Sequence, residues 1–455
     1  NFHDGKLDWA LQDSLKLLEI FPDSQDIKDR IKTVSSLKAY NQACQSIVYL
    51  GKYLEQIKET EKIPALLGSL PKGMEQEKFA AEMKHLFLPP RDWESNEIAI
   101  LCGPGWEEWT PKSLSTGLGG SETAVVFMAQ ELTKLGWKVT VYANPGKDAG
   151  VYDGVDYRIW HDLNPKDNFN VLILWRAIGF ADVKPKAKFT ILWLHDVPEN
   201  ADFTEERVNQ IDKIAVLSEY HKSLLRVVKN GIFESMPEEK IFLTANGIAD
   251  IPLKEWKGNP KRMIYSSSVD RGLVYLVKFW PEVKKQVPEA ELHVFYGFKV
   301  FDAIHGGNPA RMAWKEQLLQ LMKQDGIHYH DRVGKEELYK EFNQSGIWAY
   351  PTDFTEISCI TAMEAQTLGA IPVCTTLAAL EETVKNGIKV DVDITTEDGQ
   401  KEYLSALVDI LQHPEKQEEI RKTMMPWAHD YFLWSNIAKL WDEKLRISLQ
   451  APEKF

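Results

Sequence analysis

The hydrophobic pattern of the chain changes near residue 97. Before this point, apolar residues recur at helical spacing over 7–20, 36–57 and 76–86, and little strand pattern is present. We therefore predict a helical extension over residues 1–90. Two interpretations of it stay open: a remnant of an array of tetratricopeptide-like repeats, and a plain helical extension that packs on the following domain.

After residue 97, short apolar runs alternate with helical segments. The runs that predict strands lie at 98–102, 138–143, 170–175, 189–195, 213–218 and 241–245, and then at 263–267, 291–296, 327–330, 347–350 and 371–375. Continuous apolar strands that alternate with helices are typical of parallel sheets covered on both faces. We predict an α/β fold with two Rossmann-like, doubly wound domains and then C-terminal helices, at 97–255, 256–425 and 426–455.

The segment 351–372, which reads PTDFTEISCITAMEAQTLGAIP, lies between two of the predicted strands. We predict a helix of about twelve residues here, ended by Gly369. Glu356 and Glu364 are eight residues apart, which is about 12 Å along a helix. This separation is too long for a glycosidase pair, whose carboxyl groups lie about 5 Å or roughly 6.5–9.5 Å apart. It suits an elongated ligand that is contacted at two places.

Each glutamate has its own expected partner in such a ligand. Glu356 is predicted at the start of the helix, where backbone N–H groups favour anions such as a diphosphate. Glu364 could accept hydrogen bonds from a ribose diol. The alternative is that both are solvated side chains of an ordinary capped helix.

Two further segments place polar groups where open α/β sheets bind ligands. The turn Gly119-Gly120-Ser121 precedes a predicted helix, whose N-terminus favours phosphate or carboxylate. His195 ends a predicted strand, where it could hydrogen-bond a sugar hydroxyl. The alternatives are a tight turn capped by Ser121 and a core histidine whose hydrogen bonds are satisfied.

These segments resemble the donor-site signature of retaining glycosyltransferases of the GT-B fold, family 4 (glycosyl transferases group 1). Members carry two glutamates separated by seven residues that bind the sugar nucleotide. Glu356 and Glu364 have this spacing, and the flanking residues 357–360 and 369–373 strengthen the match. The resemblance covers residues 97–441. It implies two lobes that face a cleft, with the last helix crossing back to the first lobe.

The resemblance also implies roles for individual residues. It assigns donor binding to the following positions: Gly119, Gly120, Ser121, Val333, Glu356, Ile357, Ser358 and Glu364. Among them, the glycine turn would face the donor diphosphate and the acceptor, and the backbone at Val333 would read the nucleobase. His195 would lie near the donor sugar. Ser218 and Asn246 also match the family, and we interpret them as markers of the fold.

The cations that neutralise the leaving diphosphate depart from the family pattern. Members commonly carry an Arg, and then a Lys followed by Gly, after the first strand of the second lobe. Here Arg271-Gly272 stands where the Lys-Gly pair is usual, and serines at 266–268 replace the earlier Arg. Because a guanidinium suits a diphosphate well, Arg271 is the predicted phosphate cation. Lys278 is a second candidate.

The composition of the chain indicates which ligands and which cellular compartment to expect. The net charge of −13 argues against a broad surface for nucleic acid. The four cysteines form no close pair along the chain, which favours reduced thiols and a cytoplasmic protein. No apolar run approaches about 18 residues, so we expect no transmembrane helix. Lys184, Lys186 and Lys188 could approach an anionic membrane surface, although a solvated loop is the commoner interpretation. The acidic tripeptide at 391–393 follows the helix–strand series, and we expect no metal ion and no cofactor.

We predict a retaining hexosyltransferase that moves a sugar from a nucleoside-diphosphate sugar, with UDP favoured, to a hydroxyl of a glycan, lipid-linked or protein acceptor. Its expected catalytic residues are His195, Glu356 and Arg271. By analogy with the family, the acceptor attacks on the face that the leaving group departs from, and the departing phosphate takes its proton. Two alternatives stay open: a GT-B sugar-nucleotide epimerase, and a non-catalytic glycan- or nucleotide-binding scaffold with residues 1–90 as its partner module.

Overall fold

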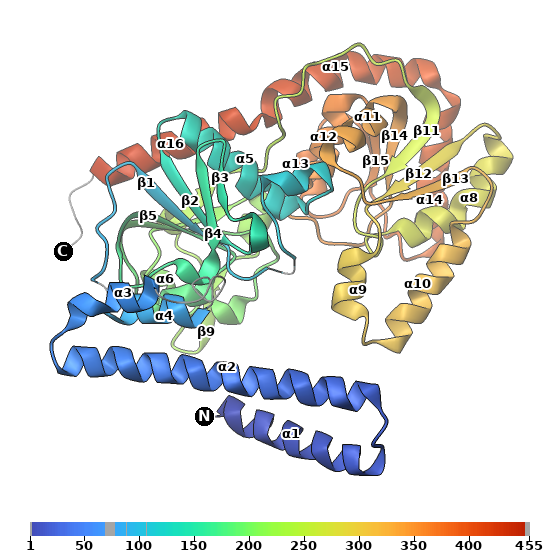
Figure 1. The fold of residues 1–455 in the computed structure, drawn as a ribbon. Helices are drawn as coiled ribbons and strands as arrows, with labels where there is room; N and C mark the ends of the chain where they lie inside the picture. Colours follow the sequence, from blue (N-terminus) through green and yellow to red (C-terminus); the bar gives the residue numbers. More distant parts are fainter. Residues whose placement is uncertain (1, 69–77, 88, 106, 451–455) are drawn as a thin grey trace. The chain divides into compact units, whose positions relative to one another are not determined.

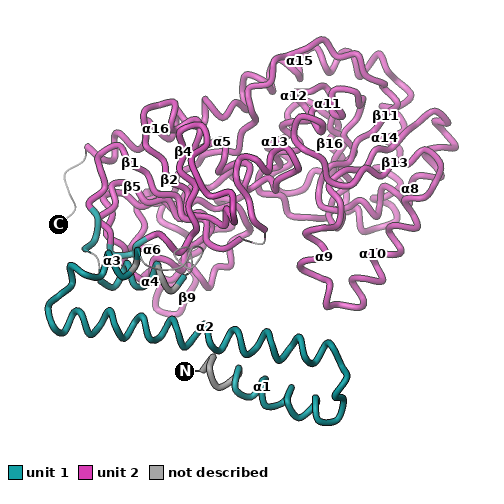
Figure 2. The backbone as a smooth tube through the Cα atoms, in the orientation of Figure 1, with its two compact units in different colours: residues 1–91, 164–166 teal, residues 92–163, 167–455 magenta. Residues whose placement is uncertain are grey.

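The computed structural model describes residues 2–68, 78–87, 89–105 and 107–450 (Figure 1). The chain forms two compact units, which Figure 2 shows in different colours: residues 1–91 with 164–166, and residues 92–163 with 167–455. None of the helices in the described ranges is both long and apolar enough to cross a membrane.

The first unit is helical. Its helices are α1 (Phe2–Ile20), α2 (Gln25–Gln56), α3 (Ile63–Gly68) and α4 (Lys78–Phe87). The side chain of Ser24 caps α2 by accepting a hydrogen bond from the Ile27 N–H, and α1 runs beside α2 (Figure 1). Leu54, Ile63 and Met83 form a small apolar core. Of the helix predicted at 76–86, residues 76 and 77 lie outside the described residues.

The second unit contains two large sheets, and the first of them defines what we call the first lobe. Its strands are β1 (Glu97–Leu101), β2 (Lys138–Ala143), β3 (Gly150–Tyr152), β4 (Val155–Ile159), β5 (Asn168–Trp175), β6 (Lys186–Trp193), β7 (Lys213–Val216) and β10 (Ile241–Leu243). Their order is β10-β7-β6-β5-β1-β2-β4-β3, and only β3 runs antiparallel to its neighbour. The hairpin of β8 (Arg226–Lys229) and β9 (Ile232–Ser235) lies outside this sheet.

Helices cover both faces of this sheet. One face packs against α5 (Gly120–Lys134) and α16 (Trp434–Gln450). The other packs against short helical turns, among them α6 (Glu205–Asn209), and α7 (Glu219–Ser223) follows β7. The short strands β3, β4, β8 and β9 were not predicted, because their residues are mostly partly exposed and lack a continuous apolar run.

The second sheet defines the second lobe. Its strands are β11 (Asn259–Tyr265), β12 (Glu291–Phe295), β13 (Ile327–Asp331), β14 (Ser345–Tyr350), β15 (Ile371–Thr375) and β16 (Ile388–Val390). They are all parallel, in the order β13-β12-β11-β14-β15-β16. Its helices are α8 (Leu273–Gln286), α9 (Lys299–His305), α10 (Pro309–Leu321), α11 (Lys335–Gln344), α12 (Ile360–Leu368), α13 (Leu380–Thr383) and α14 (Glu397–Gln412). The predicted fold class, two doubly wound domains with N-terminal helices, is confirmed.

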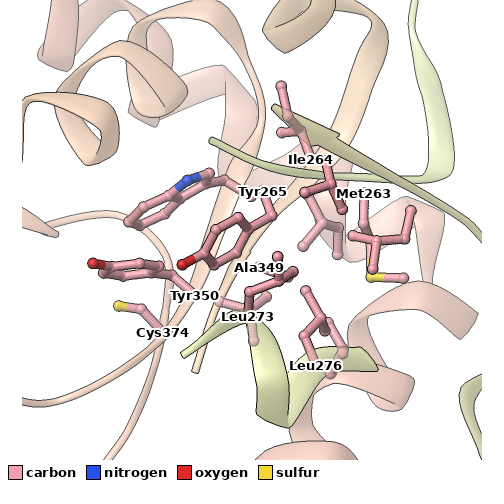
Figure 3. Packing of buried hydrophobic residues seen from close by; sticks show 14 of the residues in the cluster. Met263, Ile264, Tyr265, Leu273, Leu276, Ala349, Tyr350 and Cys374 are labelled. Atoms are coloured by element: carbon pink, nitrogen blue, oxygen red, sulfur yellow. The ribbon is translucent and has the colours of Figure 1, made fainter. Parts of the chain in front are cut away.

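The core of the second lobe extends up to the ends of its central strands. Figure 3 shows residues of β11 and β14 packed together with Leu273 and Leu276 of α8. The rings of Tyr265 and Tyr350, each the last residue of its strand, lie 5.9 Å apart. The loops that follow these two strands therefore start from a rigid base.

The last two helices join the lobes. Helix α15 (Pro414–Phe432) packs against α12 of the second lobe, and α16 packs against the first sheet. Trp441 of α16 is fully buried, its Nε1 donates to Thr244 Oγ1 at 2.8 Å, and its ring lies 5.1 Å from that of Trp193. The end of the chain is thus part of the core of the first lobe.

We expect Trp441→Ala to destabilise the first lobe strongly, because it removes a fully buried ring and leaves the Thr244 hydroxyl without its donor. Substitutions of this kind lower the free energy of unfolding by about 3–5 kcal/mol. Urea denaturation followed by far-UV circular dichroism measures the change. Ile447→Ala in the same helix is the control, because Ile447 is 61% exposed and should change the midpoint little. Equal midpoints for the two variants would contradict the packing of α16.

Candidate active site

The topology of the second sheet indicates where a ligand binds. Doubly wound sheets bind ligands outside the carboxyl ends of the strands, where the strand order reverses. In the second lobe this point lies between β11 and β14. The loops that follow these strands begin at Ser266 and Pro351. They carry two of the residues predicted from the sequence, Arg271 and Glu356.

Glu356 lies at the centre of a buried cluster of polar groups. Its Oε1 accepts a hydrogen bond from the Tyr350 hydroxyl at 2.6 Å and one from Arg271 Nη1 at 3.2 Å. The Arg271 guanidinium also stacks on the Phe354 ring, 3.8 Å from its centroid. Burial by itself would lower the pKa of Arg271, but the charge of Glu356 raises it above its usual value. The guanidinium is therefore a permanent cation, held at one end of the loop.

The glycine that follows Arg271 is required for steric reasons. Gly272 adopts a φ of 106°, in the left-handed region that favours glycine. A Cβ atom there would overlap the carbonyl oxygen of Pro351. Gly272 thus allows the loops after β11 and β14 to touch, which brings Arg271 to Glu356.

The prediction that Glu356 starts the helix is wrong. Helix α12 begins at Ile360 and is preceded by Cys359 in an extended conformation, whereas Gly369 ends it as predicted, with a φ of 91°. The backbone around Glu356 makes other hydrogen bonds: its N–H donates to Phe354 and its carbonyl accepts from the Ala379 N–H, both at 2.9 Å. Glu356 therefore lies in a loop before the helix N-terminus.

Two residues of the first lobe hold this loop. The Ser218 hydroxyl donates to the carbonyl oxygen of Ile357 at 2.8 Å, and Asn246 Nδ2 donates to that of Ser358 at 3.3 Å. Sequence reasoning treated Ser218 and Asn246 only as fold markers. The structure shows a further role for both residues: their side chains bind the candidate donor loop of the second lobe to the first lobe.

Glu364 lies further along, in α12, and is 1% exposed. Its Oε1 accepts from Lys335 Nζ at 2.6 Å and from the Tyr339 hydroxyl at 3.3 Å, both on α11. Its Oε2 is buried and has no hydrogen-bond partner within the described ranges. Neither Lys335 nor Tyr339 was predicted. Lys335 could have been predicted from the sequence, because it is a cation just after the strand and loop that contain Val333.

A pocket between the lobes brings several predicted residues together. Its cavity has a volume of about 80 Å³ and is partly open to solvent. The first lobe contributes Gly117, Leu118 and Gly120, and the second contributes Ser266, Phe295, Tyr296, Arg332, Val333, Lys335, Leu338, Ile360, Thr361 and Glu364. Gly119 and Ser121 flank the lining residue Gly120, and Gly119, not Ser121, precedes the first residue of α5. Lys278 does not line the pocket; it is an exposed residue of α8.

Beside this pocket, the backbone of one lobe lies in close contact with the other lobe. A Cβ atom at Gly117, whose φ is 102°, would lie 2.7 Å from Arg332 Cγ, and one at Gly334 would overlap the carbonyl oxygen of Ser115. Any larger residue at Gly117 or Gly334 would push the two loops apart. The two glycines therefore permit the close approach that forms the pocket.

Arg332 is a cation of the site that sequence reasoning missed. Its guanidinium donates to both carboxylate oxygens of Glu107, from the first lobe, at 3.0 and 3.1 Å. Glu107 also accepts from Lys299 at 3.2 Å. Burial works against ionisation of Glu107, but Arg332 and Lys299 lower its pKa below the usual value. The pair thus joins the lobes beside the pocket, and it could not be seen from sequence because its members are 225 residues apart.

Tyr296 lines the pocket next to Arg332. It follows β12 with a φ of 109°, which non-glycine residues rarely adopt. The Arg332 guanidinium lies 5.8 Å from the centroid of its ring. Burial raises the pKa of Tyr296, so its hydroxyl stays protonated and can donate a hydrogen bond. Strained residues of this kind cluster at ligand sites, which agrees with its place in the pocket.

His195 lies at the end of β6 in the first lobe and does not line this pocket. Its ring packs between Trp175 and Trp193, with centroids 5.7 and 4.7 Å away. Burial, together with the charge of Arg176, lowers the pKa of His195 well below its usual value. Its Nε2 is buried without a hydrogen-bond partner in the described chain. The ring is thus neutral and keeps one polar atom available.

The acidic tripeptide at 391–393 has a local role. The Asp393 carboxylate accepts hydrogen bonds from the Thr395 N–H at 2.9 Å and from its hydroxyl at 2.6 Å. Asp393 thus stabilises the turn after β16. Over the residues that the structure covers, no group of three or more His, Cys, Asp or Glu side chains could hold a metal ion.

Comparisons with known proteins identify the class of this fold. Similar solved structures include sucrose-phosphate synthase from Thermosynechococcus elongatus, with 14% identity, a TM-score of 0.58, and 78% of this chain and 100% of that chain covered. A glycosyltransferase from Rickettsia africae matches with 13% identity and a TM-score of 0.54, covering 80% and 100%. Anabaena HepE in complex with UDP-glucose matches with 12% identity and a TM-score of 0.54, covering 77% and 99%. At these identities the likeness shows the fold, which is GT-B as predicted.

The match to a family model concerns the second lobe. Residues 250–424 match the family described as "Glycosyl transferases group 1". The match contains Arg271, Glu356 and Glu364. No curated protein matches the chain.

One buried histidine behind the site should make stability depend on pH. The Leu217 N–H donates to His221 Nδ1 at 3.2 Å, and His221 Nε2 donates to the carbonyl oxygen of Asp196 at 3.0 Å, which requires a neutral ring. Burial lowers the pKa of His221 to about 4. Since the unfolded chain takes up the proton near pH 6.5, this contribution to stability is present above that pH and is lost as the pH falls toward 4.

We expect His221→Gln to weaken the pH dependence of unfolding. A shift of this size makes the wild type lose about 2 kcal/mol of unfolding free energy between pH 7 and pH 5, and the variant should lose that much less. Urea denaturation at both pH values measures the difference. His413→Gln, at a half-exposed histidine, is the control. An unchanged pH dependence in His221→Gln would show that the ring is not held neutral in this way.

Proposed function

We propose that the chain is a retaining glycosyltransferase that moves a hexosyl group from a UDP-sugar to a hydroxyl of a glycan, lipid-linked or protein acceptor. The observation that carries this proposal is the unpartnered Oε2 of Glu364, in a pocket that also presents Arg332 and Lys335. A ligand with hydroxyl groups and a diphosphate complements that combination. The match of residues 250–424 to the family model of glycosyl transferases group 1 supports it. The similar fold of HepE, which is in complex with UDP-glucose, supports UDP.

The proposed reaction needs no protein nucleophile. The acceptor oxygen bonds to the anomeric carbon on the face from which the nucleotide leaves, the bond from that carbon to the phosphate oxygen breaks, and the departing phosphate takes the acceptor's proton. The protein then has to hold both partners and stabilise the diphosphate charge. Arg271 and Arg332 are the cations that we assign to this task, because both are fixed beside the cleft.

The other residues position the donor. Glu356, buried and ionically paired, would accept a hydrogen bond from a hydroxyl of the donor sugar, and neutral His195 would hydrogen-bond a sugar hydroxyl from the first lobe. Because arginines supply the positive charge, we expect turnover without an added metal ion. Buried thiols at Cys102, Cys359 and Cys374 favour a reducing compartment such as the cytoplasm.

A nucleotide screen tests the donor. We expect a UDP-sugar, but not GDP- or ADP-sugars, to raise the melting temperature of the wild type in buffer with EDTA. Glu364→Ala should abolish the shift, because it removes the predicted ribose contact. Glu336→Ala, at an exposed carboxylate of α11, should keep it. Stabilisation by none of the nucleotides would contradict the proposal. Conversion of the donor with no acceptor present would favour the epimerase.

A second prediction separates the two cations named from the sequence. We expect Arg271→Ala to lower kcat by roughly 10²–10³-fold, as loss of one preorganised charge at the reacting group does. Because the change also leaves the buried Glu356 without its counter-charge, the melting temperature should fall, so kcat is measured below the melting temperature of the variant. Arg271→Lys should recover part of the rate, since it keeps the charge but loses the planar fork. Lys278→Ala should have the smaller effect, because Lys278 is an exposed residue of α8, whereas Arg271 is held by Glu356. Near-normal turnover in Arg271→Ala would remove this residue from the mechanism.

A further inference from the structure

Glu364 presents its two carboxylate oxygens to different surroundings. Oε1 accepts hydrogen bonds from the Lys335 ammonium at 2.6 Å and from the Tyr339 hydroxyl at 3.3 Å. Oε2 is buried and finds no donor among the residues that the structure covers. Glu364 and Lys335 both line the pocket, so the unpartnered oxygen belongs to a residue of the pocket wall.

The unpartnered oxygen indicates the chemistry of its missing partner. A buried carboxylate oxygen without a donor is unfavourable, so a ligand is expected to supply one. Lys335 already provides the positive charge that Glu364 needs, and the carboxylate repels a phosphate at this point. Neutral hydroxyl groups are the donors that fit. One carboxylate oxygen can accept from two of them, as a vicinal diol would offer.

The geometry of α11 explains how Oε1 is occupied. Lys335 and Tyr339 are four residues apart in this helix, so their side chains share one face. Burial, followed by the charge of Glu364, raises the pKa of Tyr339 well above its usual value, and its hydroxyl therefore stays a donor. Two donors on the same oxygen fix the carboxylate and leave Oε2 for the ligand.

We propose that Lys335 and Tyr339 are positioning residues, which fix the side chain of Glu364 through its Oε1 and orient its Oε2 toward the ribose diol of the nucleotide. This inference rests on the proposed function and adds to it the groups that let the site distinguish a ribonucleotide from a deoxyribonucleotide. Lys335 acts through Glu364 and not by binding phosphate.

Calorimetric titration of the full chain with UDP and with 2′,3′-dideoxy-UDP tests this inference. Lys335→Met should weaken UDP binding by about tenfold or more, the effect expected for loss of hydrogen bonds to a charged group. The same variant should change the affinity for dideoxy-UDP by less than about twofold, because that ligand has no hydroxyl for Oε2. Tyr339→Phe should show the same pattern with a smaller loss. Lys340→Met is the matched control, at an exposed lysine of the same helix.

A double variant keeps the inference testable even if Lys335→Met alone does not fold. Lys335→Met alone leaves Glu364 buried without its counter-charge, which can destabilise the fold. Lys335→Met with Glu364→Gln removes both charges together, and we expect it to bind UDP and dideoxy-UDP with nearly equal affinity. A double variant that still prefers UDP as strongly as the wild type would overturn the inference.

The outcomes separate this inference from the proposed function. If Lys335→Met weakens UDP and dideoxy-UDP equally, Lys335 binds phosphate directly, and the inference is wrong while the proposed function stands. If the wild type binds UDP and dideoxy-UDP equally, the diol is not recognised and the inference is also wrong. If the wild type does not bind UDP at all, the UDP-sugar proposal fails and the inference fails with it.

Discussion

Pairing of buried charges is the constraint on which this site depends. Glu356 is paired with Arg271, Glu364 with Lys335, and Glu107 with Arg332. A charge removed from water is tolerated only with a partner, so each carboxylate fixes the position of a cation and is fixed by it. The result is a cleft in which cations are held in place without an open basic surface. This explains how a chain with a net charge of −13 can present positive charge to a diphosphate.

The site also depends on contact between the lobes. Ser218 and Asn246 of the first lobe bind the backbone that follows Glu356, and the Arg332–Glu107 pair spans the cleft. Gly117 and Gly334 allow the two backbones to approach. If the lobes separated, the loop before α12 would lose these hydrogen bonds. The conformation of the loop before α12 and the arrangement of the lobes are therefore coupled.

The sequence was informative where structure is set by nearby residues. Apolar runs predicted most strands of both sheets, although not the short strands β3, β4 and β16, and the spacing of Glu356 and Glu364 drew attention to α12. The start of that helix was placed too early, because the backbone of Glu356 is held by Phe354 and by Ala379, more than twenty residues further along. Arg332 was missed for the same reason, as its partner Glu107 is distant in sequence. Lys278 was a second candidate beside Arg271, and the structure shows it as an exposed residue of α8.

Among the buried polar atoms that have no hydrogen-bond partner in the described part of the chain, Glu364 Oε2 and His195 Nε2 lie one in each lobe. Both belong to side chains that the fold holds rigidly, Glu364 by two donors and His195 by two tryptophan rings. A ligand that donates to such an atom recovers the unfavourable free energy of its burial, whereas an analogue without the matching hydroxyl does not. Sites of this kind discriminate strongly against ligands that lack one polar group. The selectivity of the cleft would therefore arise from hydroxyl groups at these two points, while the arginines supply affinity for any diphosphate.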